Sequence, residues 1–187
     1  MTEQTSSPHF TLADRFTLML AEGFGLGRIP IAPGTFGSLW GILIGWGLWR
    51  LGTSPVERIA LCGVLFLPGI AICQRGAELR KSKDPSSVVW DEITAFPMVY
   101  AFATLNWTWL IVGFVLFRFF DIVKPWPLRQ LEKLPGGLGI ITDDVVAGIY
   151  AAACLAAFQF LTASFPWRHG SGALSLLHCW IGWPGQD

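Results

Sequence analysis

The chain has 187 residues, of which 52% are hydrophobic, 14% aromatic and only 14% charged. Soluble domains usually carry roughly 25% charged residues, so this composition excludes an ordinary water-exposed globule. Thirteen Lys and Arg balance thirteen Asp and Glu; without a net basic field, nucleic acid is not expected as a partner. The short Gly- and Pro-bearing connections and the modest length predict one domain over residues 1–187.

Long stretches of the sequence contain no charged residue. They are 29–49, 59–74, 93–117 and 145–167. A helix of about 20 apolar residues can cross a hydrocarbon core about 30 Å thick, and only helices or closed barrels satisfy their backbone groups there. The expected fold class is therefore all-α, a polytopic membrane helical bundle.

The first expected element, 10–21, is a helix that either lies on the membrane surface or packs against the core. The first crossing then has a glycine at every fourth position from Gly37 to Gly45, and the last crossing has small residues with the same spacing from Gly148 to Ala156. Because stripes of small residues let helices approach closely, we predict that the first and last crossings pack together.

The uncharged run over 93–117 has Asn106 near its centre, which is unfavourable inside one membrane helix. We predict instead a helical hairpin over 85–123 that turns at Asn106, with the flanking tryptophans at the membrane interface. Asp84 followed by proline is expected to cap the first arm, which would run to Thr104. The bundle then has about five crossings.

The distribution of Lys and Arg supports this count, because such residues gather in cytoplasmic loops. With five crossings and an inner N-terminus, ten lie inside and three lie outside, namely Arg50, Arg58 and Arg168. With four crossings the split is seven against six. Five crossings are therefore preferred.

Five crossings bring six carboxylates to one membrane face, close to the cations Arg118 and Lys124. The six are Asp84, Asp91, Glu92, Asp121, Asp143 and Asp144. Asp91 and Glu92 are adjacent and point about 100° apart on a helix, so they need a hub to act together. A divalent ion such as Mg²⁺ takes oxygen ligands and is often shared with phosphate, so phosphate chemistry is the leading hypothesis.

Two sets of these charged residues can also be explained by a purely structural role, and the sequence leaves that alternative open. Arg118, Asp121 and Lys124 are spaced three residues apart and can form a salt-bridge ladder on one helix. Asp143 and Asp144, at the expected start of the last crossing, can serve as helix caps.

Glycine-rich turns at 23–28 and 33–35 can offer backbone N–H groups to an anion or can simply be chain turns; they do not match a P-loop. The histidines His9, His169 and His178 lie outside the predicted cluster, and no cysteine is followed by five residues and arginine. A cysteine or histidine phosphoenzyme is therefore not expected. Attack by water is the simplest mechanism, with an aspartyl-phosphate left open.

Several segments together resemble the phosphatidylglycerophosphatase A family over about residues 20–160. They are Gly34-Thr-Phe-Gly-Ser38, Val89-Trp-Asp-Glu92, Phe117-Arg-Phe-Phe-Asp-Ile-Val-Lys-Pro-Trp-Pro127 and Gly136-Gly-Leu-Gly-Ile-Ile-Thr-Asp-Asp-Val-Val-Ala-Gly148. The resemblance implies a bacterial, Mg²⁺-dependent enzyme of the inner membrane. The predicted crossings and the distribution of Lys and Arg make it a multi-pass protein with the carboxylate cluster on the cytoplasmic side. It would hydrolyse phosphatidylglycerophosphate to phosphatidylglycerol. It also implies an all-α fold with a central helix surrounded by others.

The resemblance further implies roles for individual residues. The metal ligands would be Glu92, Asp121 and Asp144, with Asp91 and Asp143 as further ligands or water-orienting groups. Lys124 completes this catalytic set. The substrate would be bound by Arg28, Gly34, Thr35, Arg118 and Lys124. The tail over 168–187 lies outside the resemblance and receives no role.

Two rival functions use similar residue types. A CDP-alcohol phosphotransferase-type lipid enzyme also combines membrane helices with carboxylates and Mg²⁺, but its DG-x2-AR-x8-G-x3-D-x3-D pattern is missing from the sequence. A non-enzymatic transporter or assembly protein can use buried carboxylates to relay ions or to pair helices.

Overall fold

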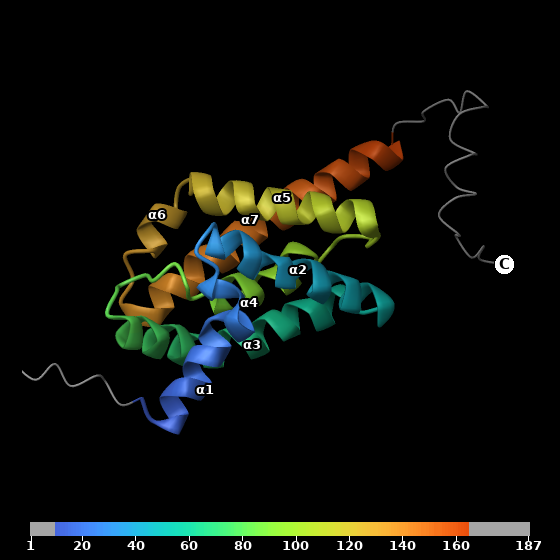
Figure 1. Cartoon of the computed structure of the whole chain (residues 1–187). Helices are drawn as coiled ribbons and strands as arrows, with labels where there is room; N and C mark the ends of the chain where they lie inside the picture. The colour runs from blue at the N-terminus through green and yellow to red at the C-terminus, as the bar shows by residue number, and fades with distance from the viewer. Residues whose placement is uncertain (1–9, 165–187) are drawn as a thin grey trace, which may run out of the picture.

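The computed structural model describes residues 10–164, and every regular element in that range is a helix (Figure 1). The all-α class is thereby confirmed. The tail at 168–187 lies outside the described residues. The elements are α1 (Leu12–Ala21), the 3₁₀ helix η1 (Gly23–Arg28), α2 (Pro33–Arg50), α3 (Pro55–Arg80), α4 (Trp90–Val99), α5 (Trp107–Val123), α6 (Leu128–Leu131) and α7 (Gly136–Ser164).

Helix α4 lies at the centre, packed against α2, α3 and α7 (Figure 1). Its Phe96, Val99 and Tyr100 are fully buried in the main hydrophobic core, together with Phe117 of α5. The Arg58 guanidinium, from α3, donates to the carbonyls of Tyr100 and Ala103 at 2.7 and 2.8 Å, which satisfies backbone groups where α4 ends. The family's central helix is thus α4.

The predicted first arm of the hairpin is wrong. Helix α4 has only ten residues, about 15 Å at 1.5 Å per residue, which is half of a bilayer core. The segment before it does not continue the helix, because Val88 N–H donates to Pro85 O and Val89 N–H donates to Ala21 O, each at 2.8 Å. Asp84 therefore caps no helix.

The predicted turn at Asn106 is correct. Asn106 is the N-cap of α5, and its side chain accepts a hydrogen bond from Trp109 N–H at 3.0 Å. The second arm ends at Val123, before Pro125 as expected.

Within residues 10–164, two helices are long and apolar enough to cross a membrane, α3 with 26 residues and α7 with 29. The prediction of about five crossings is not confirmed. Apolar side chains nevertheless cover outward faces of other helices as well: Ile111, Val115, Phe119 and Ile122 recur along α5 and are all more than half exposed. A continuous apolar surface of this kind is typical of a protein that contacts lipid or a partner.

The stripes of small residues contact α4 rather than each other, so the predicted packing of first on last crossing is wrong. Gly37, Gly41 and Gly45 of α2 lie against Val89, Phe96 and Tyr100, with no room for a side chain. Gly148 of α7 faces the backbone of Ala95. The small residues do allow close helix packing, as expected, but both α2 and α7 pack against α4 and not against each other.

Helix α1 packs against the rest of the protein, as the second of the two alternatives predicts. Leu18 and Ala21 are buried, and α1 packs on α3, while Leu12 and Phe16 remain exposed. A capping box formed by Thr11 and Asp14 fixes its start.

Candidate active site

A cavity of about 280 Å³ lies between the N-terminal parts of α2, α4 and α7 and the C-terminal end of α5. All the catalytic and substrate-binding residues predicted from the sequence line this cavity, except Arg28. The lining comprises Ala32, Pro33, Gly34, Thr35, Asp84, Ser86, Val88, Asp91, Glu92, Arg118, Asp121, Lys124, Ile140, Asp143 and Asp144.

Glu92, in the first turn of α4, is buried and held by two donors. The Ser38 hydroxyl donates to Oε2, and Arg118 Nη1 donates to Oε1 at 3.0 Å. Burial raises the pKa of Glu92 to about 8, although the Arg118 charge and the Ser38 hydrogen bond act in the opposite direction. In the absence of a metal this carboxyl group therefore retains a proton near neutral pH.

Asp91 is equally buried but lacks a cationic partner among residues 10–164. Its Oδ1 accepts the N–H of Glu92 at 2.9 Å. Burial, and then the charge of Glu92, raise the pKa of Asp91 well above its usual range. An additional positive charge in the cavity would stabilise the ionised form.

The predicted ladder on α5 is only half formed. Arg118 Nη1 lies 2.8 Å from Asp121 Oδ2, and the same guanidinium reaches Glu92 on α4. Lys124 does not pair with Asp121: its Nζ lies 2.7 Å from Asp143 and 3.5 Å from Glu132. Burial lowers the pKa of Lys124, but its interaction with Asp143 outweighs this and raises it overall. The cations therefore connect three helices.

Asp143 and Asp144 are not helix caps. Helix α7 starts at Gly136, seven residues earlier, because Gly137 packs directly on the main chain of Ile70 and Gln74 in α3. Both carboxylates are buried, 4% and 5% exposed. One oxygen of Asp143 is held by Lys124, while Oδ1 is buried without a hydrogen-bond partner in the described part of the chain.

The donor set suits Mg²⁺, because carboxylate oxygens from three helices face one small cavity and one of them is unsatisfied. Asp91 and Asp144 are the buried acids that form no ion pair within residues 10–164. In this arrangement, however, no three His, Cys, Asp or Glu side chains of those residues already form a metal-binding group. Arg118 and Lys124 instead hold Glu92, Asp121 and Asp143.

Gly34 and Thr35 lie at the start of α2, beside the Glu92–Arg118 pair. A side chain at Gly34 would overlap Glu92 Oε1, so glycine keeps this wall open, and Thr35 is exposed at the rim.

Sequence reasoning missed the role of Ser38, which is fully buried and whose single hydroxyl lies within hydrogen-bond distance of both Gly34 O, at 2.8 Å, and Glu92. It also missed Glu132 as a second partner of Lys124. The sequence feature that could have indicated Ser38 is a hydroxyl residue among the glycines at the start of an apolar helix.

Arg28 lies in a neighbouring cavity, where it pairs with the fully buried Glu22. The glycine turn that carries Arg28, η1, has left-handed backbone at Phe24 and Gly25.

Cys62 and Cys73 are free and buried, and they do not line the carboxylate cavity.

Comparison with known proteins points to the family that the sequence motifs resemble. The family model described as phosphatidylglycerophosphatase A matches residues 19–159. A phosphatidylglycerophosphatase A of Haemophilus influenzae is 43% identical over 86% of this chain and 98% of its own length, and one of Escherichia coli is 38% identical over 73% and 80%. A Bacteroides thetaiotaomicron protein with the provisional name phosphatidylinositol-3-phosphatase is 35% identical over 77% and 94%.

No solved structure matches the chain significantly. The family match spans the four motifs and the residues around the carboxylate cavity. The chain therefore belongs to the phosphatidylglycerophosphatase A family.

Proposed function

We propose that this protein hydrolyses the terminal phosphomonoester of phosphatidylglycerophosphate, giving phosphatidylglycerol and inorganic phosphate. The observation that carries the proposal is the cavity in which buried carboxylates of α4 and α7 face Arg118 and Lys124. The identity of the lipid substrate is inferred from the family and from the names of the relatives.

Each side chain has a defined task in the proposed reaction. Arg118 and Lys124 bind the phosphate oxygens and offset the negative charge that grows on them during the displacement. Asp143 Oδ1, unpartnered in the described part of the chain, accepts a proton from the attacking water. The bond between phosphorus and the glycerol oxygen then breaks, and that oxygen leaves with a proton from solvent.

Asp91, Asp144, Glu92 and Asp121 would hold Mg²⁺, with Asp143 as a further ligand or water-orienting group. When bound, the ion adds positive charge next to the phosphate and acidifies a water molecule. Binding would require Glu92 and Asp121 to exchange part of their contact with Arg118 for the metal, which releases that guanidinium to the substrate.

We place the protein in the bacterial inner membrane as a multi-pass protein with this cavity on the cytoplasmic side. The long apolar helices α3 and α7 and the exposed apolar stripe of α5 support a membrane location. The lysines and arginines of the segments that join helices at the cavity support the orientation. Family membership favours this function over the phosphotransferase-type and transporter alternatives.

Phosphate release by the purified full-length protein tests the proposal. The wild type is expected to be active on phosphatidylglycerophosphate with Mg²⁺ and inactive with a chelator. Asp144→Asn and Asp121→Asn should lose about a hundredfold or more in kcat/KM. Glu78→Gln, at an exposed acid of α3 outside the cavity, is the matched control. Full activity of both Asp variants in chelator would rule out the mechanism.

A further inference from the structure

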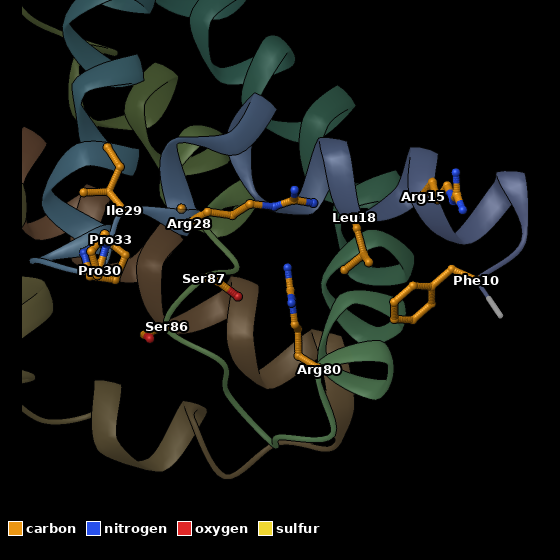
Figure 2. A pocket seen from close by; sticks show the side chains of 11 residues that line it. Phe10, Arg15, Leu18, Arg28, Ile29, Pro30, Pro33, Arg80, Ser86 and Ser87 are labelled. Atoms are coloured by element: carbon orange, nitrogen blue, oxygen red, sulfur yellow. The ribbon is translucent and has the colours of Figure 1, made fainter. Parts of the chain in front are cut away.

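A second and larger cavity, of about 880 Å³, adjoins the carboxylate cavity (Figure 2). Pro33 and Ser86 line both, so the two cavities share a wall. The polar lining of the larger cavity is basic, whereas that of the carboxylate cavity is mainly acidic. It consists of Arg15 of α1, Arg28 of η1, Arg80 of α3, Ser86 and Ser87. Among residues 10–164, no acidic residue is part of this lining.

The arginines of this cavity carry more positive charge than residues 10–164 neutralise. Arg28 and Arg80 both pair with Glu22, whose side chain is fully buried behind them. One carboxylate cannot balance two guanidinium groups, and Arg15 forms no ion pair within residues 10–164. The side chains of Arg28 and Arg80 are 59% and 36% exposed, and Figure 2 shows them directed into the same space.

The cavity is held in shape by backbone contacts. Gly27 lies so close to the Ser87 carbonyl that any side chain at position 27 would collide with the main chain. Val89 N–H donates to Ala21 O at 2.8 Å, which joins the segment carrying the two serines to the end of α1. Glu22 fixes Arg28 and Arg80 from below. The guanidinium groups are therefore oriented in advance, which reduces the entropy lost on binding.

We propose that this arginine cavity binds the phosphodiester group of the lipid while the carboxylate cavity holds its terminal phosphomonoester; this rests on the proposed function. Phosphatidylglycerophosphate carries both groups, separated by one glycerol unit. Guanidinium groups and hydroxyls are the natural partners of phosphate oxygens. Phe10, Leu18 and Ile29 in the lining of the arginine cavity, and the exposed Leu12, Phe16 and Ile31 close to lining residues in the sequence, offer apolar contact to the acyl chains. The arginine cavity thereby selects lipids with two phosphates.

Two substrates test this specificity. Phosphatidylglycerophosphate has both phosphates, whereas phosphatidic acid has only the monoester. In phosphatidylcholine vesicles, Arg15→Gln and Arg80→Gln should each lower the ratio of kcat/KM for the first lipid to that for the second by about three- to tenfold, through KM. An inactive fraction of either variant cancels from this ratio. Arg50→Gln changes an exposed arginine at the far end of α2 and should leave the ratio unchanged.

Binding of glycerophosphoglycerol, the soluble phosphodiester without acyl chains, gives a readout that does not depend on turnover. The wild type should bind it more tightly than Arg15→Gln does, and inorganic phosphate should compete weakly. Equal binding by both proteins, or an unchanged substrate ratio, would overturn the proposal. So would a defect that appears only when the vesicles contain phosphatidylglycerol, because the cavity would then bind bulk anionic lipid. Absence of wild-type phosphate release from phosphatidylglycerophosphate would instead refute the proposed function.

Discussion

Lys124 and Asp143 form an ion pair of 2.7 Å that joins the end of α5 to the buried part of α7. The Lys124 side chain is 23% exposed and that of Asp143 only 6%. The pair therefore lies at the boundary between solvent and the carboxylate cavity, and it leaves the second Asp143 oxygen without a partner in the described part of the chain.

Replacing Lys124 should destabilise the protein as well as inactivate it. In Lys124→Gln the buried Asp143 loses its only ion pair among the described residues, which costs about 1–3 kcal/mol in free energy of unfolding. Chemical denaturation in detergent measures this change. Lys83→Gln, at an exposed neighbour of the cavity mouth, should change stability by less than about 0.5 kcal/mol. Equal stability of both variants would show that the pair contributes nothing.

Arg118 is expected to resist conservative replacement. Its Nη1 contacts Glu92 and Asp121 at once, on two different helices, while its buried Nε has no partner in the described part of the chain. A lysine ammonium has one nitrogen and cannot hold both carboxylates and also offer a second donor atom to a phosphate. Arg118→Lys should lower kcat/KM for phosphate release by about tenfold to a hundredfold. Arg129→Lys, where the exposed side chain donates only to Val123 O, is the control. A fully active Arg118→Lys would mean that charge alone suffices at this position.

Magnesium should stabilise the protein more at alkaline than at acidic pH. The pKa of Glu92 is raised to about 8 in the folded protein from an ordinary 4.5, so the metal-free protein loses stability as the pH rises between these values. A metal binds the ionised form and reverses that loss. The gain in Tm on adding Mg²⁺ should therefore be larger at about pH 8 than at about pH 6.

Glu92→Gln provides the control for this pH dependence. The amide does not titrate, so the difference between the two pH values should shrink. A gain in Tm that is the same at both pH values in the wild type would contradict coupling between metal and proton binding.

Gly41 should tolerate no side chain. An added Cβ would overlap the Phe96 ring of α4, and overpacking of this kind costs about 1–3 kcal/mol or more. Gly41→Leu should thus lower both Tm and phosphatase activity. Gly47→Leu is matched in chemistry and lies on the same helix, but nothing lies within 4 Å of its added Cβ. Unchanged folding and activity of Gly41→Leu would contradict the close packing of α2 on α4.

Labelling of single cysteines tests the orientation. Positions 82 and 133 lie in the segments that follow α3 and α6, both beside the carboxylate cavity. A membrane-impermeant thiol reagent should reach both from the cytoplasmic side and a cysteine at position 52, in the turn between α2 and α3, from the other. Opposite accessibility of positions 82 and 133 would contradict a shared cytoplasmic cavity.

The sequence predicted the composition of the carboxylate cavity well because its motifs are separate blocks of charge in an apolar chain. Burying isolated carboxylates in an apolar bundle is unfavourable, so such residues are expected to gather at one polar site. One cavity is indeed lined by Asp91, Glu92, Asp121 and Asp144. The turn at Asn106 was also predictable, because a polar side chain before an apolar run acts locally as a helix cap.

The prediction of membrane crossings failed at α4, because hydropathy does not distinguish a buried central helix from a lipid-exposed one. The start of α7 was also misplaced, since the contact of Gly137 with the α3 backbone depends on tertiary packing. The pairing of Lys124 with Asp143 and the buried Glu22 beneath two arginines depend on the same kind of long-range contact.

Arg58 donates to the carbonyls of Tyr100, the C-cap of α4, and of Ala103 just beyond it, and this contact bears on the opposite end of the helix. A helix has a partial negative charge at its C-terminus and a partial positive charge at its N-terminus. The buried guanidinium neutralises the negative pole, while the positive pole, with Asp91 and Glu92, opens into the carboxylate cavity. The macrodipole of α4 thus meets an opposite charge at each end, Arg58 at one and the first-turn carboxylates at the other, so a change at Arg58 would alter the electrostatic potential of the cavity from the far end of the helix.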